Sequence, residues 1–206
     1  MTLKAAVVEE HECTRIAVEE ILNRASDIDF VGGFTGVGPV LKSGSEVNVL
    51  LLGSNQCQPD MPAVINQLKE AHPNLRIIVL GRQWNEASIR AVLECGVDGI
   101  VDRDEPLHDL LAAGVRRTAR GKRFLSHEVA AILANASTGN NERLSPRELD
   151  IVLLMSDGAI TKEMAAALGV SRKTINRNQS TICEKWNLRS KDQIVAEAIR
   201  RGIISK

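Results

Sequence analysis

The chain has 206 residues, of which 44% are hydrophobic and 25% are charged, a composition with ample apolar side chains for a folded core. No apolar segment is long enough to span a bilayer, and the first apolar run is too short for a signal peptide, so we expect a cytoplasmic protein without membrane contact. The cysteines show no C-x-x-C spacing and no nearby histidine cluster, which argues against a zinc site and a disulfide framework; we expect no metal and no cofactor.

The charges are unevenly distributed, although basic and acidic residues balance at 26 each. From Arg143 onward the chain holds 12 basic and 7 acidic residues, a net charge of +5, whereas residues 1–142 hold 14 and 19, a net charge of −5. A basic module joined to an acidic one is typical of a nucleic-acid-binding domain with a separate sensory or dimerising domain.

Residues 1–121 alternate between short apolar runs and helical patterns. The expected strands are Leu3–Val8, Phe30–Phe34, Val47–Leu52, Leu75–Leu80 and Gly99–Val101. The expected helices are Thr14–Ala25, Gly36–Leu41, Pro62–His72, Glu86–Cys95 and Pro106–Arg120. Five strand-then-helix units predict a doubly wound, five-stranded, mostly parallel sheet. Such folds carry their sites in the loops at the carboxyl ends of the strands.

At those loops the sequence resembles the receiver domain of NarL/FixJ-type response regulators. The resemblance rests on VVEEH, on the apolar strand that ends at Leu52, on AHPNLRIIVL and on ECGVDGIVDRDEP. It implies an acidic pair for Mg²⁺, a phosphoacceptor Asp after the third strand, a hydroxyl after the fourth and a Lys after the fifth. The corresponding positions are Glu9 and Glu10 for the acidic pair, Gly53 for the Asp, Gly81 for the hydroxyl and Arg103 for the Lys.

These substitutions predict a pseudo-receiver domain. Glycine has no carboxylate, so no acyl phosphate can form at Gly53, and the metal would lose a protein oxygen. Asp60, a few residues on, could accept a phosphoryl group only if its loop rearranged. The space left at Gly53 and Gly81 could admit a small anionic or aromatic ligand, or a protein partner near Trp84. Collapse of the loops into that space is the simpler expectation, and Trp84 would then be ordinary core.

Residues 122–142 are predicted to link two domains. They contain a short helix over Ser126–Asn135, followed by the small and polar stretch Ala136–Glu142, which has the composition of a flexible linker. Residues 143–206 form the second expected domain. Its first helix opens with Leu144-Ser145-Pro146-Arg147-Glu148, where Ser145 and Glu148 have the spacing of a capping box and Pro146 suits the first helical position.

Thr161–Leu188 reads as a helix, a tight turn and a longer helix. Gly169 allows the turn, and Ser171 is placed to cap the second helix. Ile175, Ile182 and Trp186 share one face of that helix, and polar residues share the other. Arginine and asparagine side chains can read guanine and adenine in the major groove. The residues expected to contact DNA are Arg172, Lys173, Thr174, Asn176, Arg177, Ser180, Lys185 and Arg189.

The second domain resembles the four-helix, helix-turn-helix DNA-binding domain of the same LuxR-type regulators. The matching segments are LSPRE, EMAAALGVSRKTI and SKDQIVAEAI. Asn176 stands where the family usually has Lys and Asn178 where it usually has His, while Gln179 is polar in a slot that is often apolar. The operator therefore cannot be copied from a relative.

The whole pattern predicts a transcriptional regulator that binds double-stranded DNA without Asp phosphorylation, and not an enzyme. The resemblance also implies a homodimer, formed through the last helix, with a second surface on the first and last helices of the receiver-like part. The alternative is a receiver-like dimerisation or partner-binding protein whose helix-turn-helix domain has lost DNA binding. The cationic face at Arg172, Lys173 and Arg177 favours the first interpretation, whereas Asn176 and Gln179 favour the second.

Overall fold

The computed structural model describes residues 2–42, 47–54, 61–135 and 144–204. It divides into two compact units, an N-terminal unit of Met1–Val129 and a C-terminal unit of Ala130–Lys206. The division falls inside helix α6, His127–Ala134, and not in the polar stretch that follows it. Within the described ranges, no helix is both long and apolar enough to cross a membrane.

The N-terminal unit is built on a parallel sheet with strand order β2-β1-β3-β4-β5-β6. Its strands are β1 Leu3–Val8, β2 Ile28–Phe34, β3 Val49–Gly53, β4 Arg76–Gly81, β5 Gly99–Asp102 and β6 Phe124–Leu125. All residues of β3, all but one in each of β4 and β5, and the last four of β1 are buried, as expected for parallel strands covered on both faces. The strand order reverses between β1 and β3, and in folds of this kind the carboxyl ends of the strands on either side of such a reversal are where ligands bind.

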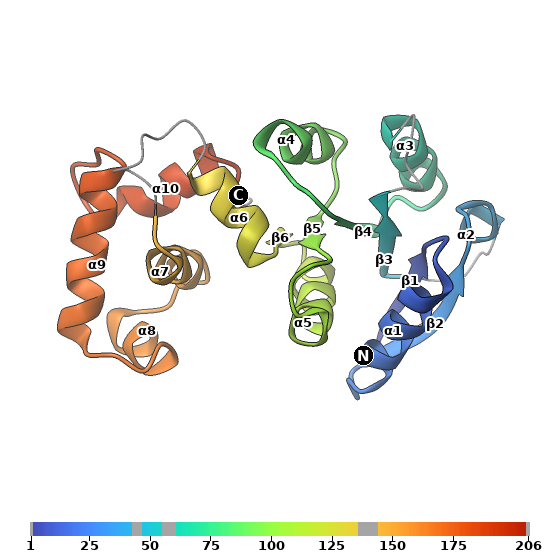
Figure 1. Cartoon of the computed structure of the whole chain (residues 1–206), viewed down its shortest axis with the longest axis horizontal. Coiled ribbons are helices and arrows are strands. Elements are labelled where there is room, and N and C mark those ends of the chain that lie inside the picture. The colour runs from blue at the N-terminus through green and yellow to red at the C-terminus, as the bar shows by residue number, and fades with distance from the viewer. Residues whose placement is uncertain (1, 43–46, 55–60, 136–143, 205–206) are drawn as a thin grey trace. The chain divides into compact units, whose positions relative to one another are not determined.

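Helices cover both faces of this sheet (Figure 1). One face carries α1 Glu12–Asn23 and α5 Leu107–Ala119; the other carries α2 Gly38–Lys42, α3 Met61–Ala71 and α4 Glu86–Glu94. The main core lies under α1 and α5, where Val18, Leu22, Leu111 and Val115 pack on the sheet. The doubly wound parallel fold predicted from the sequence is therefore present.

The prediction of five strands was wrong, because a sixth strand, β6, pairs in parallel with β5. Gly99 pairs with Phe124 and Ile100 with Leu125. Two residues are too few to show the alternation or the apolar run by which a strand is recognised in a sequence. A side chain at Gly99 would come within 2.8 Å of the Phe124 carbonyl oxygen, so the close approach of these two strands depends on that glycine.

The C-terminal unit is a bundle of helices. It contains α7 Pro146–Ser156, α8 Thr161–Ala167, α9 Arg172–Lys185 and α10 Gln193–Arg200 (Figure 1). Helix α7 packs against the other three, and α8 packs against α9. Ser145 caps α7 by accepting a hydrogen bond from the Glu148 N–H at 3.3 Å, while the Glu148 carboxylate accepts one from the Ser145 N–H at 2.6 Å. This reciprocal pair is the capping box that the sequence predicts.

Candidate nucleic-acid interface and sheet-edge cluster

Four elements bring the predicted pocket residues together at the carboxyl edge of the sheet. Glu9 follows β1 and Arg103 follows β5, whereas Gly53 and Gly81 are the last residues of β3 and β4. The Arg103 N–H donates to the Gly81 carbonyl oxygen at 2.8 Å, and the Arg103 guanidinium forms an ion pair with the Glu9 carboxylate. We call Glu9, His11, Trp84 and Arg103 the sheet-edge cluster.

The Glu9 carboxylate is fully buried and has partners on both oxygens. Oε1 accepts hydrogen bonds from the His11 N–H at 3.1 Å and, when the ring nitrogen carries a proton, from His11 Nδ1 at 2.8 Å; Oε2 accepts one from Arg103. Burial acts to raise the pKa of Glu9, but the hydrogen bonds from His11 and the charge of Arg103 outweigh it, so that this pKa is lowered. A charged carboxylate is thus held in the interior.

The two residues of the predicted acidic pair differ in exposure. The Glu9 side chain is buried and that of Glu10 is exposed, and their carboxylates lie 2.8 and 3.9 Å from His11 Nδ1. Sequence reasoning gave no role to His11, the last residue of VVEEH, although its position two residues after Glu9 gives its backbone N–H and its ring access to that carboxylate. Among the described residues, no group of three or more His, Cys, Asp or Glu side chains could hold a metal ion.

Both glycines face space that other side chains fill. A Cβ at Gly53 would overlap Glu9 Oε2 and lie 2.9 Å from Arg103 Nη2. A Cβ at Gly81 would overlap the ring of Trp84, with Trp84 Cε2 at 2.9 Å. The side chains of Glu9 and Arg103 therefore fill the space at Gly53 and that of Trp84, which is partly buried, fills the space at Gly81. Cys57 and Asp60, which the sequence places in the loop after β3, lie outside the described residues.

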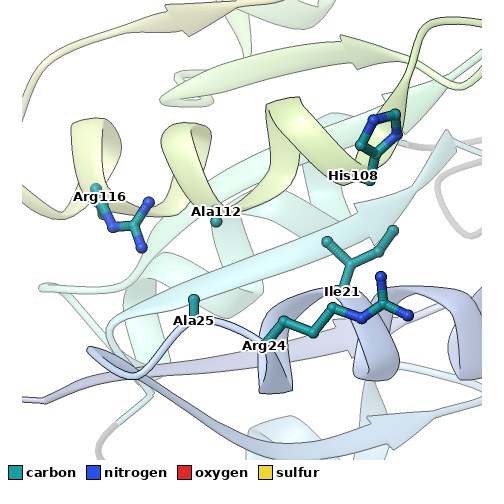
Figure 2. Close-up of a pocket in the computed structure, with 6 residues that line it drawn as sticks. All are labelled: Ile21, Arg24, Ala25, His108, Ala112 and Arg116. Atoms are coloured by element: carbon teal, nitrogen blue, oxygen red, sulfur yellow. The ribbon is translucent and has the colours of Figure 1, made fainter.

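Apart from the sheet-edge cluster, the N-terminal unit has a surface hollow between α1 and α5, with a volume of about 270 Å³ (Figure 2). Its walls combine small apolar and cationic side chains, namely Ile21, Arg24, Ala25, His108, Ala112 and Arg116. Arg116 is engaged by Asp27 through two hydrogen bonds of 2.7 and 2.6 Å, which lowers the pKa of Asp27 to about 2. On α1, the nearby Ile16 side chain is 56% exposed.

Helix α9 has the two faces that its sequence predicts. Ile175, Ile182 and Trp186, the C-cap residue, are buried against the rest of the C-terminal unit. The residues exposed on the opposite face are Arg172, Lys173, Asn176, Arg177 and Ser180. Within the part of the chain that the structure describes, no acidic side chain pairs with Arg172, Lys173 or Arg177. This face therefore presents uncompensated positive charge.

The start of α9 is held by local hydrogen bonds. Ser171 Oγ accepts from the Thr174 N–H at 3.1 Å and lies 2.9 Å from Thr174 Oγ1, so Thr174 is engaged in the cap. Asn176 Oδ1 accepts a hydrogen bond from Lys191 Nζ at 3.1 Å. Lys191 was not among the predicted DNA contacts. Lys191 adds a further cation beside the exposed face, and Arg189, in the loop after α9, is exposed as well.

Lys185 differs from the other predicted DNA contacts. Its ammonium group lies 2.6 Å from Glu148 Oε2, and the two side chains are only 21% and 5% exposed. Its ammonium group lies beside the first turn of α7, and it does not add to the exposed positive charge of α9. Gln179 is buried too, with its Nε2 3.5 Å from the Met155 sulfur. Gln179, the polar residue in the apolar stripe of α9, is therefore packed inside the C-terminal unit.

This arrangement of helices and the sheet-edge cluster can be compared with known proteins. Residues 142–198 match the model of the luxR family of bacterial regulatory proteins. Over 99% of its length the chain is similar to the response regulator protein VraR of Staphylococcus aureus, with 29% identity over 210 residues that cover all of that protein. Sequence similarity to a response regulator thus extends through both units, and similarity to the luxR family is found in residues 142–198.

Solved structures show the same fold. The response regulator RcsB of Salmonella typhimurium superposes with a TM-score of 0.58 at 23% identity, over 95% of this chain and 97% of that one. A complex of the two-component response regulator RcsB with DNA gives a TM-score of 0.58 at 22% identity, over 98% and 99% of the two chains. A further structure contains two RcsB dimers bound to two parallel DNAs.

Proposed function

We propose that this protein is a transcriptional regulator that binds specific double-stranded DNA through helix α9. The observation that carries the proposal is the exposed face of α9, where Arg172, Lys173 and Arg177 lie opposite a buried apolar stripe. A helix that is anchored on one side and cationic on the other can enter the major groove. The luxR-family match of this segment and the DNA complexes of RcsB support the same interpretation.

The side chains of α9 divide into two kinds of contact. Asn176 and Arg177 carry groups that can form paired hydrogen bonds with adenine and guanine, so they are assigned to base recognition, with Ser180 beside them. Arg172, Lys173 and Arg189 are assigned to phosphates, as is Lys191. Lys185 is removed from the set, because its charge is already neutralised by Glu148.

A titration of two variants tests this assignment. A duplex is first obtained by selection from random sequences with the full chain, and a scrambled duplex serves as reference. Arg177→Ala should lose about 1–3 kcal/mol on the selected duplex and little on the scrambled one. Lys173→Ala should weaken both duplexes alike and reduce the salt slope by about one unit. Arg90→Ala, on the exposed surface of α4, is the control and should change neither.

The alternative function predicts other results. If no duplex is enriched, or if neither α9 variant alters binding, the domain does not use this face for DNA. The protein would then be a receiver-like dimerisation or partner-binding module. The burial of Gln179 within the C-terminal unit weakens this alternative, because that residue was one of the two signs, with Asn176, of a helix that has lost DNA binding.

The N-terminal unit is proposed to act without phosphotransfer. Gly53 has no carboxylate, and the space around it is filled by Glu9 and Arg103. Incubation of the full chain with acetyl phosphate or beryllium fluoride should therefore leave its mass and its DNA affinity unchanged. A stoichiometric gain in mass that maps to Asp60 would contradict this.

The protein is also proposed to bind DNA as a homodimer. The outer face of α10, with Ala196 and Arg200 exposed, provides one surface, and the α1–α5 face of the N-terminal unit provides another. Two DNA-binding units related by a two-fold axis would read a palindromic site with half-sites about one helical turn apart.

A further inference from the structure

The sheet-edge cluster does not fit the divalent cation that a receiver-like fold implies. Mg²⁺ takes oxygen ligands and is usually held by one or two carboxylates. Here both oxygens of the buried Glu9 carboxylate already have partners, and Gly53 contributes no side-chain oxygen. The Glu10 side chain is exposed and lies beside His11, and Asp102 Oδ1 accepts a hydrogen bond from the Asp104 N–H at 2.9 Å, within its own loop.

A buried carboxylate nevertheless needs a positive charge beside it. Removing an ionised carboxylate from water is costly unless it is paired and hydrogen-bonded. Glu9 is fully buried, and Arg103, of which only 11% is exposed, is its cationic partner. His11 lies on the other oxygen, on the solvent side, with most of its side chain exposed.

The position of the guanidinium relative to Gly53 is the decisive observation. A Cβ at residue 53 would lie 2.9 Å from Arg103 Nη2 and would overlap Glu9 Oε2. A carboxylate carried on that Cβ would therefore meet the guanidinium together with Glu9. A cation held jointly by Glu9 and by a carboxylate at residue 53 would have to occupy this same space.

From this we infer that Arg103 is a built-in cation, which takes the place of the divalent metal beside Glu9 and keeps metal out of the N-terminal unit. The inference rests on the proposed absence of phosphotransfer and deepens it. With the positive charge supplied by the chain itself, the edge of the sheet is held in one charge state whatever the concentration of divalent cations.

The test restores a carboxylate at residue 53 with and without Arg103. Full-length Gly53→Asp and Gly53→Asp/Arg103→Ala are titrated with Mn²⁺, and free Mn²⁺ is measured by electron paramagnetic resonance. Gly53→Asp, like the unmutated protein, should bind no Mn²⁺ at this site, whereas the double variant should bind one equivalent. Gly53→Asp/Arg82→Ala is the matched control and should behave as Gly53→Asp, because Arg82 pairs with Asp104 at the exposed surface, 3.1 Å away.

Binding of Mn²⁺ by Gly53→Asp alone would overturn the inference, as would failure of both variants to bind it. If the double variant folds only when Mn²⁺ is present, the inference is supported. A second measurement needs no metal: Arg103→Gln should lower the urea midpoint of the N-terminal unit, and Glu9→Gln/Arg103→Gln should recover most of the loss. No recovery would show that Arg103 does not act through the Glu9 charge.

These outcomes are separable from failure of the proposed function. A gain in mass of the unmutated protein with acetyl phosphate would refute phosphorylation independence. It would leave open whether Arg103 excludes the cation, which the Mn²⁺ titration decides independently.

Discussion

At the scale of single residues, Lys185 and Glu148 show how a basic side chain near a helix end can serve stability. Glu148 completes the cap of α7 and accepts hydrogen bonds from the Ser145 N–H and from Lys185. Burial acts to raise the pKa of Glu148, but the hydrogen bonds from Lys185 and Ser145 outweigh it and the pKa is lowered. The pair therefore ties the start of α7 to the end of α9.

Replacing Lys185 with Ala should destabilise the C-terminal unit by about 2 kcal/mol, because a nearly buried carboxylate loses its cation. The figure is below that for a fully buried pair, since Lys185 is partly exposed. Urea unfolding of the full chain measures the loss. Lys173→Ala, at an exposed position on the same helix, should stay within about 0.5 kcal/mol of the unmutated protein. Equal effects of the two substitutions would contradict a stabilising role for Lys185.

The same pair predicts a dependence on pH. A group whose pKa is lowered on folding stabilises the fold above its ordinary pKa, here 4.5, and that contribution is lost as the pH falls through the lowered value. The difference in unfolding free energy between the unmutated protein and Lys185→Ala should therefore be largest near neutral pH and should shrink in acid. A difference that grows as the pH falls below 4.5 would have the wrong sign.

At the scale of the element, the helices of the C-terminal unit begin in different ways. Ser145 and Ser171 cap α7 and α9 with a side-chain oxygen. At the start of α8, Glu163 accepts a hydrogen bond from the Ile160 N–H at 2.9 Å, but Ile160 has no oxygen to offer in return and is 60% exposed. Only half of a capping box is present there.

Ile160→Thr should stabilise the C-terminal unit by about 1 kcal/mol, since it adds the missing acceptor for the first turn of α8. Ile160→Val has the same branched shape as Thr without the oxygen and is the matched control. Thermal unfolding of the two variants separates hydrogen bonding from the removal of exposed apolar surface. Equal melting temperatures would show that the cap is not formed.

At the scale of the whole molecule, the proposed homodimer depends on the charges of the α1–α5 face of the N-terminal unit. The α1–α5 face carries acidic residues Glu19 and Glu20 on α1 and basic residues Arg24 and Arg116 at the hollow. A two-fold axis across this face could place unlike charges opposite one another around Ile16. This arrangement supports a second dimer contact in addition to that of α10.

Ala112→Arg should weaken the proposed dimer, because it puts a bulky cation into a hollow that already holds Arg24, Arg116 and His108. Sedimentation of the full chain over a range of concentrations measures the effect. Ala87→Arg, on the exposed surface of α4, should leave self-association unchanged. A chain that is strictly monomeric both free and on DNA would rule out the dimer.

Local patterns in the sequence were sufficient to predict the helices and most of the strands. Leu3–Val8 was predicted with the bounds that the structure shows, because a buried parallel strand is a nearly continuous apolar run, here broken only by Lys4. Strand β6 was missed, since its pairing with β5 depends on the third dimension and its two residues carry no period of their own.

Contacts between residues distant in sequence account for the remaining differences at the candidate sites. Glu148 lies 37 residues before Lys185, so helix periodicity alone could not show that this lysine has a partner. Arg103 lies 94 residues after Glu9, and its substitution for the family's Lys indicated only a loss of function. Arg103 fills the space beside Gly53 because the carboxyl ends of β1, β3, β4 and β5 lie next to one another in the sheet.

The hydrogen bond from the Leu144 N–H to Asn135 Oδ1, 2.7 Å long, has a consequence for protein engineering. Both residues belong to the C-terminal unit, so the eight residues 136–143 join two points that are held together within one unit. Extra residues inserted there would lengthen a segment whose two flanking residues, Asn135 and Leu144, are already hydrogen-bonded to each other. Because closure entropy grows only logarithmically, doubling this loop with glycine and serine should cost about 0.6 kcal/mol. The site therefore suits the insertion of a fluorescent or affinity module.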